Sequence, residues 1–305
     1  MSIQKIDFSC KHDVLIQNED GVLLPMDTPY FECDCIASGT WRIRSDGDVS
    51  YLVEGDREAI VIDSGYGAGN IRAYCQSLTA KPVRCIINTH DHFDHTANNA
   101  YFDKAYMTEA TRPLATIPYP SFKGIDFPRN YPVEIVKEGD KIDLGGRTLE
   151  VIEIPDHAVG SIALLDSRER ILFSGDEITS SFKWINGYVD TVLGQMEKLR
   201  SRRDEFDVIW TGPGDSCSPH LIDQYVETLE YLLSGGKGEP GMGYYPPKRP
   251  VRELNPELAG RTIYDRGRAR MCDRKLNNSK DGDGDIYHVS RFGALVVYHP
   301  DRLHI

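Results

Sequence analysis

The sequence predicts an α/β fold, and three observations support this prediction. Short apolar runs rich in β-branched residues are spaced among stretches with helical periodicity. The run Val83–Thr89 (VRCIINT) has the composition of a buried strand, and a cluster of histidines follows it directly. Proteins of this class commonly place their functional sites past the carboxyl ends of such strands. The 305 residues, 40% apolar and 27% charged, provide ample material for a buried core.

Five elements are expected in the first part of the chain, after an N-terminal extension that ends near residue 40. Alternating apolar residues bounded by Gly- and Asp-rich turns predict three strands in a β-meander, which a helix and a fourth strand follow. The expected ranges are 41–44, 49–53 and 59–62 for the strands, 70–78 for the helix and 83–89 for the fourth strand. The histidine cluster comes next, so the order is β-β-β-α-β-site.

The segment Thr111–Pro132 interrupts regular structure. Its five prolines exclude a regular helix and predict a long surface loop. Two interpretations of this loop stay open: it forms a wall of a substrate pocket, or it packs irregularly without touching a ligand. Further strands are expected after it, over residues 148–154, 161–166 and 170–174.

Two helices are expected to complete the main unit. The first begins with Asp190 as its N-cap, and its apolar positions form one stripe, made of Val192, Leu193, Met196 and Leu199. In the second helix Ser218 is the expected cap and Pro219 the expected first helical residue. Proline is favoured there because the backbone N–H at that position has no partner within the helix. The pair Gly235-Gly236 is expected to end this helix.

The composition of the chain changes after residue 236. A Gly- and Pro-rich stretch follows, so we divide the chain into a main domain of residues 1–236 and a C-terminal appendage of residues 237–305. Alternation over Ile286–Tyr298 predicts a small β-hairpin at the end of the appendage. The acidic run Asp281–Asp285 lacks the glycine and the glutamate of a calcium loop, and a hairpin turn is the better interpretation.

Charge and composition restrict the partners and the compartment. With 35 basic and 47 acidic residues the net charge is −12, which repels the phosphate backbone of a nucleic acid. The N-terminus lacks the apolar stretch of a signal peptide, and no segment approaches the ~18 apolar residues of a membrane span. We therefore expect a cytoplasmic protein without a membrane partner. The seven cysteines are expected to be reduced, and Cys217, with no recognisable base beside it, is not expected to be a nucleophile.

Residues Thr89–His95 (THDHFDH) have the composition of a metal site. Three imidazoles and two carboxylates fall within seven residues, a density of metal ligands for which a structural core has no use. Along an extended segment His90, His92 and Asp94 point to one side, while His95 reaches a second position. The spacing therefore favours two neighbouring metal ions over one.

Four ordered motifs resemble those of the metallo-β-lactamase-fold superfamily, which includes the glyoxalase II-like thioesterases and the lactonases. The signature HxHxDH is matched by His90, His92, Asp94 and His95. The opening strands, the second histidine motif and the bridging-aspartate motif of the family are matched by residues 50–65, 157–161 and 173–176. The resemblance covers about residues 40 to 235. It implies a four-layer αββα sandwich with metals at one edge, in which residues 1–236 form the catalytic domain.

The resemblance also implies which residues bind metal. The first ion would be held by His90, His92 and His157. The second ion would be held by Asp94, His95 and a final family histidine, with Asp176 bridging the two ions. Imidazole and carboxylate ligands without cysteine suit Zn²⁺, Mn²⁺ or Fe²⁺.

Two aspartates receive catalytic roles from the same resemblance. A water shared by two divalent ions is the expected nucleophile, and Asp94 would orient it and then pass a proton to the leaving group. Asp63 would fix the tautomer of a ligand histidine through a hydrogen bond.

At the last family ligand the sequence departs from the pattern. The family usually has Pro-Gly-His, whereas this chain has Pro213-Gly214-Asp215. We expect Asp215 to bind metal, and its oxygen donor then makes the second position better suited to Mn²⁺ or Fe²⁺. The alternatives are that His220 supplies the imidazole, or that the second site is weakened and one metal works alone.

Two further places leave alternatives open. Asp156 stands where the family usually has glycine, and it either forms hydrogen bonds within the site or faces solvent. The run Ser180–Tyr188 follows the bridging aspartate, and its Lys183, Trp184 and Tyr188 either contact substrate or pack.

Together these residues predict a dinuclear metal-dependent hydrolase, most simply with two Zn²⁺ ions, that cleaves a small ester, thioester, lactone or amide. The alternatives are an iron-dependent oxidoreductase of the same fold and a phosphodiesterase. A small-molecule substrate is expected, since the acidic chain lacks a basic, aromatic groove for nucleic acid. Specificity is expected to come from residues 111–132 and 237–305, and the alternative for the latter is a homo-oligomer contact.

Overall fold

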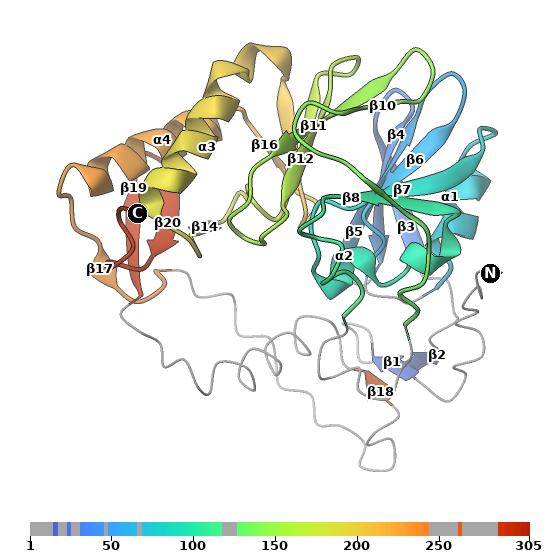
Figure 1. The fold of residues 1–305 in the computed structure, drawn as a ribbon, viewed down its shortest axis with the longest axis horizontal. Coiled ribbons are helices and arrows are strands. Elements are labelled where there is room, and N and C mark those ends of the chain that lie inside the picture. Colours follow the sequence, from blue (N-terminus) through green and yellow to red (C-terminus); the bar gives the residue numbers. More distant parts are fainter. Residues whose placement is uncertain are drawn as a thin grey trace. The chain divides into compact units, whose positions relative to one another are not determined.

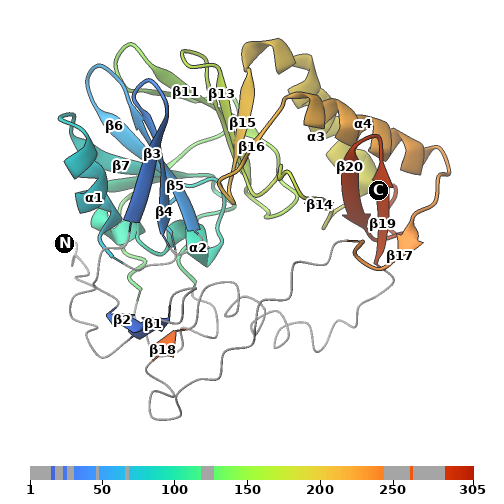
Figure 2. The same ribbon diagram turned by 180° about the vertical axis from the view of Figure 1, so that it is seen from behind.

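The computed structural model describes residues 31–45, 48–65, 69–117, 127–243 and 286–305, together with three short backbone segments at 15–17, 23–25 and 262–263. The chain forms two compact units. Among the described residues, the N-terminal unit runs to Val136 and includes Leu144–Gly146, and the C-terminal unit contains Lys137–Asp143 and the chain from Arg147 onward, apart from the short segment at 262–263. Figure 1 and Figure 2 show the elements of both units from opposite sides.

A seven-stranded sheet is the framework of the N-terminal unit. Its strands stand in chain order: β3 (Phe31–Ala37), β4 (Thr40–Ser45), β5 (Asp48–Glu54), β6 (Ala59–Ile62), β7 (Val83–Ile87), β8 (Lys104–Met107) and β9 (Val133–Ile135). The strands from β3 to β6 form an antiparallel meander, and β6 to β9 are parallel. The four strands predicted in this region are confirmed within two residues at each end. Strands β3, β8 and β9 were not expected.

Helix α1 (Ile71–Leu78) connects two of the parallel strands, β6 and β7. Asn70 caps it by accepting a hydrogen bond from the backbone N–H of Ala73 at 3.0 Å. Ile71 and Cys75, one turn apart, lie in a hydrophobic core shared with strand residues such as Val61. The short helices α2 (Phe93–Thr96) and η2 (Asn99–Tyr101) follow β7.

Three short strands form a separate sheet in the same unit. Strand β1 (Leu15–Gln17) pairs antiparallel with β2 (Leu23–Pro25) and parallel with β18 (Thr262–Ile263). A backbone segment late in the chain therefore lies beside the N-terminal extension.

The C-terminal unit is built on a six-stranded sheet. Its order is β10 (Lys141–Asp143), β11 (Thr148–Glu153), β12 (Ile162–Asp166), β13 (Ile171–Gly175), β15 (Val208–Thr211) and β16 (Ser216–Cys217). Every residue of β12 and β13 is buried, as expected for central strands covered on both faces. The predicted strands at 148–154, 161–166 and 170–174 are confirmed within one residue.

Two helices and a small sheet complete this unit. Helices α3 (Val189–Ser201) and α4 (His220–Leu233) share a hydrophobic core with the strands, to which Met196 and Leu229 contribute; a 3-10 turn, η4 (Arg203–Glu205), follows α3. The small sheet has the order β14 (Lys183–Trp184), β20 (Ala294–Tyr298), β19 (Tyr287–Arg291) and β17 (Glu239–Pro240). Val296 of the predicted C-terminal hairpin lies in the same core. The division at residue 236 stays a prediction.

The helix ends differ in how well the sequence predicted them. The expected N-cap at Asp190 is wrong, because α3 begins at Val189 and Asp190 lies in its first turn. There its carboxylate accepts the backbone N–H of Thr191 at 2.7 Å and of Ile305 at 3.1 Å. For α4 the expected end is confirmed, since Gly235 takes the left-handed φ of +93° directly after Ser234. The expected start is wrong by one residue, because Pro219 is the N-cap and His220 the first helical residue, whose N–H the Ser218 hydroxyl accepts at 3.3 Å.

Two other expectations concern irregular segments. The described parts of the predicted loop, 111–117 and 127–132, contain turns and no helix or strand. The hairpin turn expected at 281–285 lies outside the described residues. In the part of the chain that the structure describes, no helix combines the length and the apolar character needed to cross a membrane.

A buried ion pair in the C-terminal unit joins Arg147 to Asp166, the last residue of β12. The guanidinium of Arg147 and the carboxylate of Asp166 are 1% and 0% exposed, and Nε of Arg147 donates to Oδ2 of Asp166 at 2.9 Å. Asp166 also accepts backbone N–H groups from Arg168 and Glu169. Removing one partner would leave a buried charge without compensation, which costs far more than an exposed pair contributes.

Substitution Arg147→Met is therefore expected to lower the free energy of unfolding by about 3–5 kcal/mol. Urea denaturation followed by circular dichroism measures this value. The exposed pair between Arg170 and Asp207 supplies the control, since Arg170→Met should cost less than ~1 kcal/mol. Equal losses in the two variants would contradict the assignment.

Candidate metal centre

The histidine cluster lies just past the end of β7. Two buried residues, Asn88 and Thr89, separate the strand from His90, and helix α2 carries Asp94 and His95. His90, Asp94 and His95 are no more than 2% exposed, whereas His92 is half-buried. Three buried polar side chains this close together need specific partners, because burial without hydrogen bonds is costly.

The carboxylate of Asp63 is the main partner of this cluster. It follows β6 and is only 3% exposed. Its Oδ1 accepts the backbone N–H of Thr89 at 2.8 Å, and its Oδ2 accepts the Thr89 hydroxyl at 2.7 Å and lies 2.9 Å from Nδ1 of His95. The backbone of Asp63 has a φ of +59°, a left-handed conformation that aspartate tolerates better than most residues.

These contacts determine the tautomers of two histidines. A carboxylate that accepts from both groups of Thr89 acts as an acceptor towards His95 as well, so Nδ1 of His95 carries the proton. The Thr89 hydroxyl donates to Asp63 and therefore accepts from Nδ1 of His90, 3.1 Å away. In both rings the Nε2 atom then offers a lone pair, which is the form that binds a metal.

The donor atoms of the cluster suit a cation. Ring nitrogens of His90 lie within 4.8 Å of ring nitrogens of both His92 and His95. The Nε2 of His95 lies 3.2 Å from Oδ2 of Asp94. Two lone-pair donors this close repel each other, and a divalent ion bound by them would offset this repulsion. The residues of this unit thus fit the metal that the signature predicted.

The peptide group of His95 is also held in place. Its carbonyl accepts the backbone N–H of Ser64 and the side-chain amide of Asn88, each at 2.8 Å. Asn88 bonds to Asn99, which in turn donates to the hydroxyl of Tyr131 at 3.0 Å. The segment after residue 127 is therefore connected to the ligand loop through buried amides.

Two predicted ligands of the C-terminal unit lie close together. His157 is in the loop between β11 and β12, and Asp176 follows β13. Their side chains are 21% and 14% exposed, and Nε2 of His157 lies 3.6 Å from Oδ2 of Asp176. Imidazole and carboxylate face each other here as in the N-terminal unit.

The loop that carries Asp215 closes against Asp176. A Cβ on Gly212 would collide with Oδ1 of Asp176, so only glycine allows this approach. The Thr211 hydroxyl donates to Oδ1 of Asp215. Oδ2 of Asp215 is buried, and among the described residues it has no hydrogen-bond partner. A buried carboxylate oxygen in this state is suited to an ion.

His220, the alternative to Asp215, lies on the surface of α4. Its side chain is 77% exposed, and its Nδ1 lies 3.2 Å from Oδ2 of Asp223. Asp223 also pairs with Arg203. This placement agrees with a surface histidine.

Asp156 is buried and bonded instead of facing solvent. Its side chain is 1% exposed and pairs with Lys183, which is equally buried and also pairs with Glu177. The alternative in which Lys183 contacts substrate is therefore wrong, because its ammonium is enclosed by these carboxylates. Trp184 is half-buried in β14, and Tyr188 is 41% exposed. Sequence reasoning missed Glu177, whose one signal was its place beside Asp176.

Cys217 lies in β16, near Asp215. It is 8% exposed, and burial, reinforced by the Asp215 carboxylate, raises the pKa of its thiol to about 11. A thiol with this pKa is protonated at neutral pH and is a poor nucleophile. This agrees with the expectation that Cys217 takes no covalent part in catalysis.

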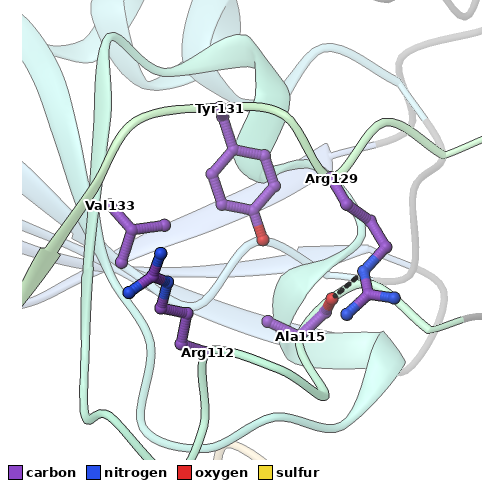
Figure 3. A pocket seen from close by; sticks show the side chains of 5 residues that line it. All are labelled: Arg112, Ala115, Arg129, Tyr131 and Val133. Carbon is purple, nitrogen blue, oxygen red and sulfur yellow. Dashed lines mark hydrogen bonds between the residues drawn. The ribbon is translucent and has the colours of Figure 1, made fainter.

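A pocket of about 330 Å³ lies in the N-terminal unit, where the predicted loop packs on the sheet. It is lined by Arg112, Ala115, Arg129, Tyr131 and Val133. Figure 3 shows two guanidinium groups on either side of the Tyr131 ring. Nε of Arg129 donates to the Ala115 carbonyl at 3.1 Å, which orients this side chain, and Arg112 is 58% exposed. Positive charge in an acidic chain makes this pocket suited to an anionic group.

Comparison with known proteins adds relatives to this geometry. The sequence model of the metallo-beta-lactamase superfamily matches residues 46–229. Acyl-coenzyme A thioesterase MBLAC2 of Homo sapiens is 29% identical over 183 residues, covering 49% of this chain and 66% of that protein. The Gallus gallus protein of that name is 31% identical over 156 residues, with 42% and 56% covered. Hydroxyacylglutathione hydrolase of Wigglesworthia glossinidia brevipalpis is 29% identical over 139 residues, with 46% and 49% covered. The chain thus spans 49% to 66% of the length of these relatives.

Solved structures give the same fold. BJP-1, a subclass B3 metallo-beta-lactamase of Bradyrhizobium japonicum, matches with a TM-score of 0.51 and 21% identity, covering 67% of this chain and 93% of that one. The sec-alkylsulfatase Pisa1 from Pseudomonas sp. matches with a TM-score of 0.56 and 13% identity, covering 73% and 49%. The predicted α/β fold of metallo-β-lactamase type is confirmed.

The role of Asp63 leads to a prediction about metal affinity. Asparagine tolerates the same left-handed backbone, but its amide has one acceptor oxygen where the carboxylate has two, so it cannot accept all three hydrogen bonds from Thr89 and His95. Substitution Asp63→Asn is therefore expected to weaken metal binding by about 10- to 100-fold. Competition with a chromophoric chelator measures the affinity. The control Asp103→Asn removes an exposed carboxylate paired with Arg72 and should change nothing. Equal affinities of Asp63→Asn and wild type would disprove the role.

Proposed function

Because the chain belongs to the metallo-beta-lactamase superfamily, we propose that it is a metal-dependent hydrolase of small acyl compounds, with thioesters as the leading class. One observation carries the proposal. The Asp63–Thr89–His90 and Asp63–His95 hydrogen bonds hold two buried imidazoles in the metal-binding tautomer beside a third histidine and an aspartate. A structural core has no need of this arrangement.

The two groups of donors would serve one dinuclear centre. His90, His92, Asp94 and His95 come from the N-terminal unit, and His157, Asp176 and Asp215 from the C-terminal unit. Family membership and the donor types of each group support this combination. Zn²⁺ suits the imidazole-rich ligands. The carboxylate of Asp215, in place of the usual histidine, favours Mn²⁺ or Fe²⁺ at the second position.

Divalent ions held by these residues would make a water molecule acidic enough to act as the nucleophile near neutral pH, and they would polarise the scissile carbonyl. The protein residues orient and transfer protons. Asp94, 1% exposed and 3.2 Å from Nε2 of His95, is a short carboxylate that orients the nucleophile and accepts its proton. Passing this proton to the leaving group completes the reaction. Asp63 keeps the imidazoles aligned throughout.

Relatives and charge support a thioester with an anionic leaving group. The relatives above are named as an acyl-coenzyme A thioesterase and a hydroxyacylglutathione hydrolase, and both names denote thioester chemistry. Arg112 and Arg129 place positive charge in the pocket of the N-terminal unit. A phosphorylated or carboxylated thiol carrier would complement this charge, which the rest of the acidic chain would repel. The proposed partner is thus a small anionic thioester in the cytoplasm, and a nucleic acid is disfavoured.

Activity is tested by a hydrolysis screen. We expect release of free thiol from acyl thioesters in the presence of Zn²⁺ or Mn²⁺, slower hydrolysis of the matching oxygen esters, and none after chelation. Metal analysis of protein purified without added zinc accompanies the screen. Iron as the bound metal, together with oxygen uptake and no hydrolysis, would replace the hydrolase with an oxidoreductase. Cleavage of phosphodiesters alone would establish the phosphodiesterase.

The cationic pocket makes a separate prediction about KM. Substitution Arg112→Ala is expected to raise KM for an anionic thioester about fivefold, as for loss of a partly exposed charge pair worth ~1 kcal/mol, with kcat unchanged. KM for a neutral thioester should stay constant. Arg57→Ala is the matched control, because Arg57 has the same 58% exposure and does not line the pocket. A rise in KM for the neutral substrate as well would contradict charge recognition.

Asp215 and His220 make opposite predictions for the second metal. Asp215→Ala is expected to weaken the second metal about 10- to 100-fold, whereas His220→Ala should keep both metals. Stoichiometry is measured by titration of the metal-free protein with Co²⁺ and by elemental analysis. If only His220→Ala loses the second metal, the ligand is His220 of α4 and not Asp215.

A further inference from the structure

A cluster of three buried charges lies behind the metal ligands of the C-terminal unit. The side chains of Asp156, Glu177 and Lys183 are each 1% exposed. Nζ of Lys183 lies 3.0 Å from Oε2 of Glu177 and 3.3 Å from Oδ2 of Asp156. Burial alone lowers the pKa of the Lys183 ammonium, but the two carboxylates outweigh burial and raise it. One ammonium thus faces two carboxylates, and the cluster contains one negative charge in excess.

The hydrogen bonds of the cluster converge on the backbone of His157. Oε1 of Glu177 accepts the N–H of Asp156 at 2.9 Å and of His157 at 2.6 Å. Oδ1 of Asp156 accepts the N–H of Asn186 at 3.1 Å and of Gly187 at 2.9 Å. The cluster therefore joins the loop of His157, the residue after Asp176 and the segment before α3.

Asn186 holds the same loop from its other side. Its side-chain amide lies 3.3 Å from the carbonyl oxygen of Asp156 and 3.2 Å from that of His157. The peptide of His157 is thus bonded at both its N–H and its C=O. The imidazole of His157 in turn lies 3.6 Å from Asp176, whose chain neighbour is Glu177. Both candidate ligands are attached to the cluster through their own backbone.

We propose that Asp156, Glu177 and Lys183 position His157 and Asp176 for metal, and that the excess negative charge of the cluster strengthens binding of a divalent cation there. The inference rests on the proposed metal-dependent function. An uncompensated buried charge is costly in the metal-free protein, and a cation bound at His157 and Asp176 offsets it. Outer partners of this kind commonly tune affinity by one or two orders of magnitude.

A purely structural role makes a different prediction, and the chain contains a matched control. The pair of Arg147 and Asp166 is equally buried but balanced one to one. Asp166 ends β12, whereas the loop of His157 precedes the opposite end of that strand. Loss of this pair removes comparable buried electrostatics at a distance from the ligands.

Three variants distinguish the effect of the cluster's charge, the effect of positioning His157, and a general loss of stability. Asp156→Asn removes one charge and keeps an oxygen for the N–H groups of Asn186 and Gly187. Asn186→Ala removes the hydrogen bond to the His157 carbonyl without changing the charge. Because Asn186 is exposed, this variant is expected to fold. Arg147→Met is the control. Each metal-free variant is titrated with Co²⁺, and the dissociation constant, the visible absorption spectrum and the urea midpoint are recorded.

We expect Asp156→Asn to weaken Co²⁺ binding about 10- to 100-fold and Asn186→Ala to alter the spectrum with a smaller loss. Arg147→Met should lower the urea midpoint and leave the dissociation constant within about twofold of wild type. An unchanged constant and spectrum in Asp156→Asn overturn the inference, as does an equal loss of affinity in Arg147→Met. Failure of the wild-type protein to bind Co²⁺ would instead refute the proposed metal-dependent function itself.

Discussion

The candidate metal ligands of the N-terminal unit depend on one buried carboxylate. Asp63 occupies a left-handed conformation, a strain of about 1–3 kcal/mol for a residue other than glycine. Three hydrogen bonds, from the N–H and hydroxyl of Thr89 and from Nδ1 of His95, offset this strain. The left-handed backbone places the Asp63 carboxylate beside Thr89 and His95. From there it determines which ring nitrogen carries the proton, directly in His95 and through the Thr89 hydroxyl in His90.

In the C-terminal unit a buried carboxylate also holds a candidate ligand in place. There Glu177 accepts the backbone N–H groups that precede and include His157, and Lys183 holds the glutamate in place. In both units the candidate ligands follow the ends of strands, on loops or, for Asp94 and His95, on the short helix α2. A buried carboxylate next to each ligand segment holds it in place. Such support orients the ligand side chains before an ion binds.

Sequence reasoning succeeded where information is local and failed where it is tertiary. Apolar alternation predicted β4 to β7 and β11 to β13 within two residues. The signature residues 90–95 indicated a metal site. Strand β3 was missed because its mixed sequence FECDCIA is only half-buried at a sheet edge. The roles of Asp156 and Lys183 stayed open, because the two residues lie far apart in sequence and only the fold brings them together.

The pairing of β14 with β20 has a consequence for how the protein is made. Lys183 and Trp184 align with Val296 and Val297, and the N–H of Ile185 donates to the carbonyl of Val297 at 2.8 Å. During translation, more than a hundred residues must leave the ribosome after Lys183 before its partner strand exists. The strand that carries the central cation of the buried cluster therefore stays without its partner strand until β20 has been synthesised, and long-range pairing of this kind forms slowly.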